Sequence, residues 1–438
     1  MAICLLDANE AEQLRGRVNS DPEFKLVARD MTVNLALEVG GERRLVKVRD
    51  GEVRTIGRFV PLTEPVDITI KGASEFWQQL LSPVPPPPFQ NLYAAVRTGN
   101  CEVAGNSELY FAYFAAITRM IDVMRELEGS LDPTPECRKA RSIKGKFEAT
   151  VGKYVYFDVH GTEYRVYFEE SGKGIPLVCQ HTAGSDGQQW RHFLTDNDIT
   201  ATYRVIVPDL PYHGKSLPPD AVEWWNREYR LTKAFFIDFH LAFKRALGLE
   251  KPVFIGSSMG GHLATDLALA CPDEYRAVIG LEAGLRSGKG SDDEIRSGWR
   301  YYRHPRVNGA ERAAASMYCR TGPLSPQKCR HEVAWTYSRG APGVFAGDLN
   351  YYMIEHDLRE TAHLIDTSRC AVYIMNGEYD PGTGIKEGEE LATKIKGATF
   401  IPIYGLGHFP MTEDFQTMRR SLMPVLEEIA ARSCSKDA

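Results

Sequence analysis

Residues 254–262 read F-I-G-S-S-M-G-G-H, and this stretch decides the fold of the second half of the chain. It contains two adjacent serines, of which one fits a Gly-x-Ser-x-Gly frame. Such a frame marks a tight turn between a strand and a helix, where the residues two before and two after the serine must be small. Centring the turn on Ser258 places Gly256 and Gly260 at these crowded positions, whereas centring it on the preceding serine places larger side chains there. Ser258 is therefore the predicted nucleophile.

Both flanks of this turn have the required character. Residues 251–255 read as a strand, and residues 261–270 read as a helix that Cys271-Pro272 ends. Further strands are predicted at 154–159, 164–169, 175–180, 203–207, 277–281, 371–375 and 398–403. Helical stretches lie between several of them, and this alternation predicts a mostly parallel sheet covered on both faces.

With these motifs, the chain from about Val151 to Arg432 resembles the α/β-hydrolase family. The order of catalytic residues in that family is nucleophile, acid, base. The resemblance implies that Asp380, in N-G-E-Y-D-P-G-T, is the acid and that His408, in Y-G-L-G-H-F-P, is the base. Glu282, which follows the strand at 277–281, is the alternative acid, because some members of the family recruit it there.

The resemblance also implies an oxyanion hole made of two backbone N–H groups. One belongs to Met259, which follows the nucleophile. The stretch C-Q-H-T-A-G-S-D-G-Q-Q-W resembles the His-Gly-x loop of the family, with Thr182 where glycine is more usual, and by that match Ala183 gives the second N–H. His181 either organises this loop or lines the substrate pocket.

A long helical insertion is predicted at about 285–366, where this family carries its cap. A cap excludes water and shapes the acyl pocket. The insertion is rich in aromatic residues, and Trp224, Trp225 and Tyr229 are further candidates for the substrate pocket. These side chains favour an apolar or aromatic substrate.

The first third of the chain has a different pattern. Between residues 31 and 72 apolar residues alternate with polar ones, which predicts an antiparallel sheet. A stiff polyproline connector at 83–88 and a helix with an apolar face at about 107–127 follow. This order of elements, with V-N-L-A-L-E-V-G-G, V-D-I-T-I-K-G and G-N-C-E-V-A-G-N, resembles the sterol carrier protein family over roughly residues 20–128. The resemblance implies an α+β domain enclosing an apolar cavity.

The predicted organisation is therefore a smaller sterol-carrier-like α+β domain at 1–128, a linker at 129–150 and an α/β-hydrolase domain at 151–438. Two domains are the natural expectation for 438 residues. A formal net charge of -6 argues against nucleic-acid binding and against a polybasic membrane surface. Nine cysteines without a C-x-x-C pair indicate reduced thiols. With neither a signal peptide nor a membrane span predicted, we expect a cytoplasmic protein.

The predicted function is hydrolysis of a carboxylic ester through an acyl-Ser258 intermediate, with no metal and no organic cofactor. The same triad would also serve a thioesterase or a carbon–carbon bond hydrolase, as in the meta-cleavage-product hydrolases. A non-enzymatic lipid-binding or interaction protein is the alternative of a different class. The expected partner is a small ester or acyl substrate, without nucleic acid or stable membrane insertion, and a homo-oligomer stays open.

Overall fold

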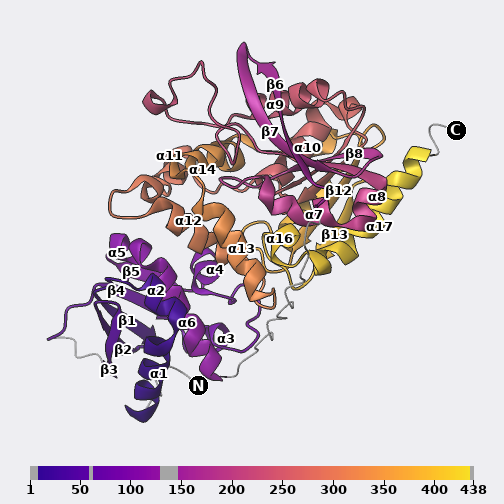
Figure 1. The fold of residues 1–438 in the computed structure, drawn as a ribbon. Helices are drawn as coiled ribbons and strands as arrows, with labels where there is room; N and C mark the ends of the chain where they lie inside the picture. The colour runs from indigo at the N-terminus through magenta and orange to yellow at the C-terminus, as the bar shows by residue number, and fades with distance from the viewer. Residues whose placement is uncertain (1–7, 59–62, 129–146, 435–438) are drawn as a thin grey trace.

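The computed structural model describes residues 8–58, 63–128 and 147–434, which form two β-sheets with separate apolar cores (Figure 1). Trp77 and Phe24 are buried in the first core, and Trp190 and Phe254 are buried in the second. Most of the predicted linker, residues 129–146, lies outside the described residues.

The first sheet has five strands in the order β3-β2-β1-β4-β5. The strands are β1 (Val33–Val39), β2 (Glu42–Arg49), β3 (Glu52–Arg58), β4 (Ile68–Gly72) and β5 (Glu102–Gly105). The prediction of an antiparallel sheet at 31–72 is wrong for β4, which pairs with β1 in parallel. Strands β1 to β3 form an antiparallel meander, but the chain then returns to the opposite edge of β1, and β4 runs in the same direction as β1. The sheet is therefore mixed.

Among the described residues, six α-helices accompany this sheet. They are α1 (Ala8–Ser20), α2 (Pro22–Val27), α3 (Ser74–Leu80), α4 (Leu92–Arg97), α5 (Ser107–Ala112) and α6 (Phe114–Glu128). The helix predicted at about 107–127 is interrupted at Tyr113, which separates α5 from α6. Asn91 caps the short helix α4 by accepting a hydrogen bond from the backbone N–H of Ala94.

The second sheet has eight strands in the order β13-β12-β11-β10-β8-β9-β7-β6. They are β6 (Val151–Val159), β7 (Thr162–Ser171), β8 (Ile175–Gln180), β9 (Tyr203–Pro208), β10 (Val253–Ser257), β11 (Ala277–Leu281), β12 (Ala371–Gly377) and β13 (Thr399–Ile403). Strands β6 and β7 pair antiparallel at one edge, while β8 to β13 are mutually parallel. Every residue of β10 and β11 is buried, as expected for parallel strands with both faces covered. The carboxyl ends of these strands face one edge of the sheet, where open parallel sheets place their sites.

Helices connect these strands and close the domain. They are α7 (Arg191–Thr195), α8 (Asn197–Thr202), α9 (Lys233–Ala246), α10 (Met259–Ala270), α15 (Ile385–Lys394), α16 (Pro410–Glu413) and α17 (Phe415–Cys434). Four more helices lie between β11 and β12, in the predicted cap: α11 (Asp292–Ser297), α12 (Gly309–Tyr318), α13 (Gln327–Ser338) and α14 (Pro342–Leu349).

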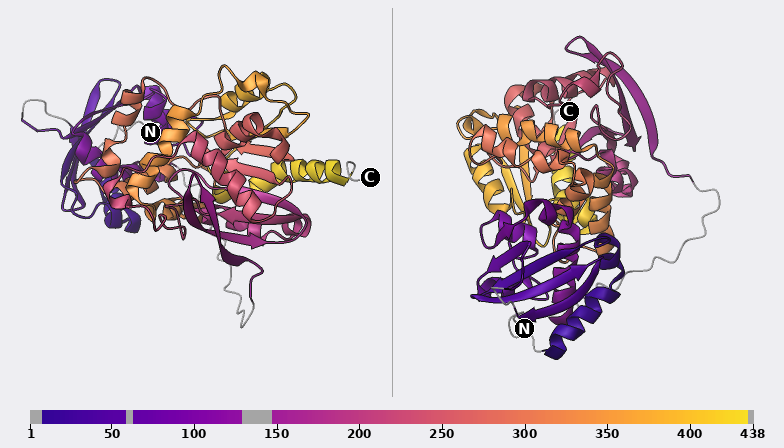
Figure 2. Two further views of the ribbon diagram at one scale, coloured as in Figure 1. Left: turned by 90° about the horizontal axis from the view of Figure 1, so that it is seen from above. Right: turned by 90° about the vertical axis from the view of Figure 1, so that its left-hand side faces the viewer.

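The cap helices lie between the two sheets (Figures 1 and 2). Helix α12 packs on both sides: Ala313 and Met317 belong to the second core, whereas Ala315 and Tyr318 pack against the first. The amino-terminal domain therefore packs against the cap.

The proline-rich segment also contacts the second domain. Tyr379, in the loop after β12, donates its hydroxyl hydrogen to the carbonyl of Pro85 at 3.2 Å. Gln90 Nε2 donates to the carbonyl of Tyr379 at 2.8 Å. The segment predicted as a connector therefore braces a loop of the hydrolase domain, next to Asp380.

The sequence predicts reduced thiols and no membrane span. Six cysteines of the described residues are free thiols. None of the helices in the described ranges is long and apolar enough to cross a membrane.

Candidate active site

Ser258 lies on the turn between β10 and α10, with a backbone φ of +57° and ψ of -110°. A residue with a side chain is strained in such a conformation. The backbone N–H of Ser258 donates to the carbonyl of Leu281 at 2.9 Å, which fixes the turn against β11. A Cβ atom on Gly256 would lie 2.3 Å from the carbonyl oxygen of Gly260, and one on Gly260 would lie 2.9 Å from that of Gln180. Glycine is therefore required on both sides of the serine.

Asp380 and His408 meet at the carboxyl edge of the sheet, Asp380 in the loop after β12 and His408 in the loop after β13. His408 Nδ1 lies 2.6 Å from Asp380 Oδ2. Asp380 also accepts hydrogen bonds from the Thr383 hydroxyl at 2.7 Å and from the Gly382 N–H at 2.9 Å. These bonds hold the carboxylate in the position that orients an imidazole with Nδ1 protonated and Nε2 free to accept a proton.

The protonation states of this pair suit a general base. Burial opposes ionisation of Asp380, but His408, Arg320 and Thr383 outweigh it, so the pKa of this carboxyl lies well below its ordinary value. Burial also lowers the pKa of His408, and Arg320 lowers it further, against the opposing effect of Asp380. Near neutral pH the pair is therefore an aspartate beside a neutral imidazole, which can take a proton.

Glu282 lies beside this pair but does not replace Asp380. It follows β11 and accepts hydrogen bonds from the Gly377 N–H at 2.9 and 3.1 Å. Carboxylate oxygens of Glu282 and Asp380 and a ring nitrogen of His408 lie within 4.8 Å of one another. Burial and the charge of Asp380 raise the pKa of Glu282 well above its ordinary value. Glu282, the alternative acid, therefore favours its neutral form beside the ionised Asp380.

The two backbone groups expected to form the oxyanion hole lie at the same end of the sheet. Met259 is the first residue of α10, so its N–H has no acceptor within the helix. Ala183 lines the cavity that contains Ser258. The next residue, Gly184, donates its N–H to Asp348 Oδ2 at 2.7 Å and so fixes the loop on the other side.

Thr182, which departs from the usual glycine, braces this loop. Its hydroxyl donates to Gln189 Oε1 at 3.1 Å and is hydrogen-bonded to the hydroxyl of Tyr337 in the cap. His181 lies fully buried beneath the loop, with Nδ1 2.8 Å from the carbonyl of Thr182 and Nε2 accepting from the Leu210 N–H at 3.1 Å. His181 therefore organises the loop and does not line the cavity.

A cavity of about 350 Å³ contains Ser258 and His408. In the part of the chain that the structure describes, no hydrogen bond joins the Ser258 hydroxyl to His408 Nε2, which instead lies 3.4 Å from Nη1 of Arg320. Catalytic hydrogen bonds are often long in unliganded enzymes and tighten when substrate binds. Aromatic rings from both the cap and the amino-terminal domain form much of the wall: Tyr110, Phe111, Phe114, Trp299, Tyr302 and Phe345.

The other predicted pocket residues lie elsewhere. Trp224 and Trp225 are 53% and 69% exposed in a short turn and are not among the residues lining this cavity. Tyr229 donates its hydroxyl hydrogen to Asp348 Oδ1 at 3.1 Å and also lies outside the lining. Aromatic composition alone did not distinguish these packing or surface rings from the rings of the cavity.

Arg320 and Tyr93 are site residues that sequence reasoning missed. Arg320 follows α12 in the cap and is 7% exposed. Its Nε and Nη2 atoms donate to the Tyr93 hydroxyl at 3.2 and 3.0 Å, and Tyr93 belongs to α4 of the amino-terminal domain. Its carbonyl accepts the backbone N–H of His408 at 2.8 Å. Arg320 thus links the amino-terminal domain to His408.

Glu413 was missed as well, and it organises the loop that carries His408. This buried carboxylate accepts the N–H groups of Gly407 and Phe409, on either side of the base, at 3.1 and 2.9 Å. It also accepts the Gly322 N–H and, at 2.8 Å, the Ser325 hydroxyl, both just after α12. The signal was present in sequence as an acid five residues after His408, but its four donors come together only in the fold.

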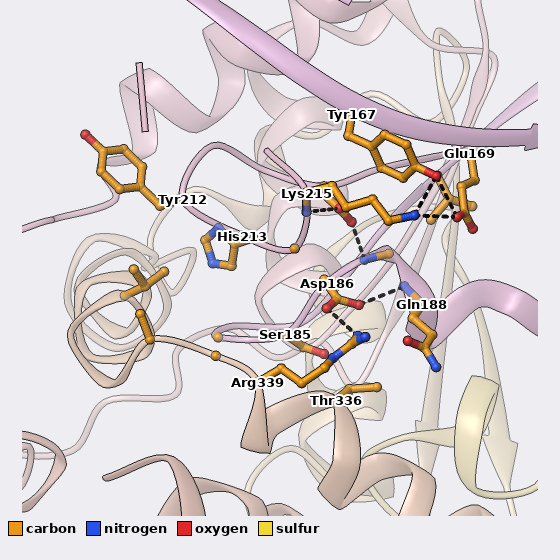
Figure 3. Close-up of a pocket in the computed structure, with 18 residues that line it drawn as sticks. Tyr167, Glu169, Ser185, Asp186, Gln188, Tyr212, His213, Lys215, Thr336 and Arg339 are labelled. Atoms are coloured by element: carbon orange, nitrogen blue, oxygen red, sulfur yellow. Dashed lines mark hydrogen bonds and ion pairs between the residues drawn. The ribbon is translucent and has the colours of Figure 1, made fainter. Parts of the chain in front are cut away.

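A second hollow, of about 380 Å³, lies beside the oxyanion loop, and its lining includes neither Ser258 nor His408 (Figure 3). Four of its charged side chains form ion pairs within the hollow. Lys215 Nζ lies 2.8 Å from the Tyr167 hydroxyl and 3.5 Å from Glu169, and Arg339 forms an ion pair with Asp186. This hollow is a polar feature that lies apart from Ser258 and His408.

A strained serine between a strand and a helix, followed by an acid and a base on later loops of a mostly parallel sheet, defines the class of α/β-hydrolases. A family model described as the alpha/beta hydrolase fold matches residues 175–415. The chain therefore belongs to the α/β-hydrolase fold family. The matched residues lie entirely after the first sheet.

Individual relatives agree with this assignment. A 2-hydroxy-6-oxononadienedioate/2-hydroxy-6-oxononatrienedioate hydrolase of Paraburkholderia phymatum is 32% identical over 140 residues, covering 31% of this chain and 46% of the relative. A 2-hydroxy-6-oxo-6-phenylhexa-2,4-dienoate hydrolase of Burkholderia cepacia is 30% identical over 140 residues, with the same coverage of 31% and 46%. The chain thus spans about half the length of the curated relatives it matches.

Among solved structures, a thermophilic esterase from Thermogutta terrifontis superposes with a TM-score of 0.54 at 21% identity, covering 64% of this chain and 99% of that one. An enol-lactonase from Burkholderia xenovorans gives a TM-score of 0.53 at 19% identity, covering 62% of this chain and 99% of that one. At these sequence identities the similarity to this chain extends to the fold alone.

Proposed function

We propose that this protein is a serine hydrolase that cleaves a carboxylic ester of an apolar or aromatic substrate through an acyl-Ser258 intermediate. The observation that carries the proposal is the conjunction of a strained Ser258 with the pair of His408 Nδ1 and Asp380 Oδ2 at 2.6 Å, on one cavity. The largely aromatic wall of that cavity supports an apolar or aromatic substrate.

In the proposed reaction Ser258 Oγ attacks the carbonyl carbon while its proton passes to His408 Nε2. The N–H groups of Met259 and Ala183 stabilise the negative oxygen of the tetrahedral intermediate. The ester C–O bond then breaks, and the alcohol leaves with the proton from His408. Water repeats the sequence on the acyl group, which releases the acid and restores the serine.

Carbon–carbon bond hydrolysis by the same three residues is the second candidate. It is favoured by the names of the Paraburkholderia phymatum and Burkholderia cepacia relatives, which are hydrolases of 6-oxo-dienoate compounds. Here His408 would have to deliver its proton to a carbon leaving group instead of an oxygen. A thioester in place of the ester would require no change in the roles of the residues.

A matched panel separates these reactions. We would measure kcat/KM for a naphthyl ester, the corresponding thioester and 2-hydroxy-6-oxo-6-phenylhexa-2,4-dienoate with the full-length protein. Fluorophosphonate labelling, followed by intact mass measurement, reports the nucleophile independently of the substrate chosen. We expect labelling and ester turnover, both lost in Ser258→Ala; folded protein with neither would overturn the proposal.

A non-enzymatic lipid carrier is the alternative suggested by the resemblance of residues 20–128 to sterol carrier proteins. Buried side chains such as Trp77, Ile117 and Met120 fill the core of this domain, and a hollow of about 610 Å³ lies between α2, α5 and α6 and the cap helices α12 and α13. Titration of a fluorescent fatty acid into protein whose Ser258 is blocked by fluorophosphonate tests the carrier function. Saturable binding to the blocked protein would favour the carrier.

A further inference from the structure

The cavity beside Ser258 combines an apolar wall with an unbalanced positive charge. Among the described residues three arginines line it, Arg97, Arg312 and Arg320, and no aspartate or glutamate does. We propose that these arginines form an anion subsite, shared by the cap and the amino-terminal domain, which binds a carboxylate group of the substrate. This inference rests on the proposed hydrolysis at Ser258 and names its substrate class: an ester with an apolar or aromatic body and a free carboxylate.

Arg320 is the buried member of the subsite. Its polar contacts are the Tyr93 hydroxyl, at 3.0 and 3.2 Å, and His408 Nε2, at 3.4 Å, and both are uncharged groups. Among the described residues no carboxylate forms an ion pair with it, and Asp380 is already committed to His408 and Thr383. Asp380 acts on Arg320 electrostatically but does not contact it, so a buried guanidinium without a contacting carboxylate favours an anion that enters the cavity.

Arg312, on α12, has free donors of its own. Its Nε and Nη1 atoms are buried and have no hydrogen-bond partner within the described ranges. The guanidinium lies 4.3 Å from the ring centroids of Phe111 and Tyr302, one from each domain. Stacking between aromatic rings fixes the plane of an arginine and leaves its edge available. These donors match the two oxygens of a carboxylate.

The amino-terminal domain supplies the remaining part through α4. Arg97 is the last residue of this helix and its side chain is exposed, so it lies at the mouth of the cavity. Its Nη2 would lie 3.2 Å from a Cβ atom built on Gly382, beside the acid loop. Tyr93, one turn earlier on the same helix, holds Arg320 in place. Without α4 the subsite would lose the charge of Arg97 and the Tyr93 hydroxyl that holds Arg320 in place.

A bound carboxylate would also change the surroundings of the base. Nη1 of Arg320 lies 3.4 Å from His408 Nε2. A carboxylate is a stronger acceptor for a guanidinium than a neutral imidazole. Binding of the substrate's anionic end would thus draw Arg320 toward itself and leave Nε2 to accept the proton of Ser258.

A binding measurement tests the subsite without requiring turnover. We would titrate 6-phenylhexanoate and its uncharged analogue 6-phenylhexan-1-ol into the full-length Ser258→Ala protein by calorimetry. We expect the acid to bind about 10- to 100-fold more tightly, the usual range for hydrogen bonds between charged partners. Equal affinity for the two compounds would overturn the inference, whether or not the wild-type protein proves to be a hydrolase.

Further variants, made in the Ser258→Ala background, show which arginines cause the preference for the acid over the alcohol. Arg312→Met and Arg97→Gln should each reduce the preference for the acid several-fold, while binding of the alcohol, the internal measure of an intact cavity, stays within about threefold. Arg54→Gln, at a β3 side chain that is 52% exposed and paired with Glu52, is the matched control and should leave the preference unchanged. A preference that survives in the combined Arg97→Gln and Arg312→Met protein would contradict the assignment.

Failure of this inference and failure of the proposed function are distinguishable. A protein that is labelled at Ser258 and hydrolyses neutral esters, but binds acid and alcohol alike, retains the hydrolase and loses the subsite. A protein that prefers the acid but shows neither labelling nor turnover retains the subsite and loses the hydrolase.

Discussion

The two sides of the cavity differ in how their polar groups are satisfied. On the triad side Asp380 receives donors from His408, Thr383 and Gly382, and each carboxylate oxygen has a partner. On the subsite side Arg312 has buried donors without acceptors among the described residues, and Arg320, which lies next to His408, contacts only uncharged groups. On the triad side the pair of His408 and Asp380 is already formed, whereas buried donors of Arg312 have no partner among the described residues. We infer that chemistry is built into the triad side and selectivity into the subsite side.

The largest expected effect would break the triad side. Asp380→Asn keeps the shape of the acid but removes the charge that fixes the tautomer of His408, so we expect kcat/KM to fall about 10³- to 10⁴-fold. Glu282→Gln is the matched control. Its carboxyl is already biased toward the neutral form, so the amide should retain activity within about tenfold. Steady-state kinetics on one neutral ester check both, and equal losses in the two variants would mean that the acid has been misassigned.

Replacing Arg320 tests how the two sides communicate. Arg320 lowers the pKa of His408, so Arg320→Met should raise that pKa. The imidazole must be neutral to act as a base, and with a higher pKa it stays protonated to a higher pH. The acidic limb of the kcat/KM profile for a neutral ester should therefore move to higher pH.

The conservative variant separates charge from geometry. Arg320→Lys keeps a positive charge in the cavity but loses the planar fork that bonds to Tyr93. Its acidic limb should stay near that of the wild-type protein. If the acidic limb of the profile moves equally in Arg320→Met and Arg320→Lys, the cause is altered packing and not the loss of charge.

A smaller effect is expected from a substitution in the amino-terminal domain, which tests how this domain holds Arg320. Tyr93→Phe removes the hydroxyl that accepts two hydrogen bonds from Arg320 while preserving the ring. We expect KM for an ester that bears a free carboxylate to rise about 3- to 10-fold, with little change for a neutral ester of equal length. A parallel rise for both esters would point to general loosening of the cavity.

The smallest expected effect is at the neighbouring serine. Ser257 is fully buried and its hydroxyl has no hydrogen-bond partner among the described residues. Ser257→Ala removes an unsatisfied polar group, so the free energy of unfolding should stay unchanged or rise by up to about 1 kcal/mol. Activity should stay within about twofold. Thermal or denaturant unfolding and ester kinetics check the two expectations.

The triad side of the cavity can be predicted from the sequence, because a local pattern and the order of elements specify its residues. Ser258 is specified by a local pattern, because the glycines that permit its strained turn lie two residues away on each side. Asp380 and His408 follow strands of a regular sheet, so the order of elements suffices to place them at one edge.

The subsite has no comparable local signal. Tyr93 and Arg320 are 227 residues apart and meet only because α12 packs against both cores. Helix α4 is six residues long and follows a proline-rich segment, too short for a periodic pattern to reveal. The parallel pairing of β4 with β1 was missed because alternation specifies a strand but not its direction.

The identity of the residue that becomes acylated tests the central claim most directly. We would treat wild-type, Ser257→Ala and Ser258→Ala proteins with a fluorophosphonate and map the adduct by peptide mass spectrometry. The account predicts a single adduct on Ser258 in the first two proteins and no adduct in the third. An adduct on another residue, or labelling that persists in folded Ser258→Ala, would contradict it.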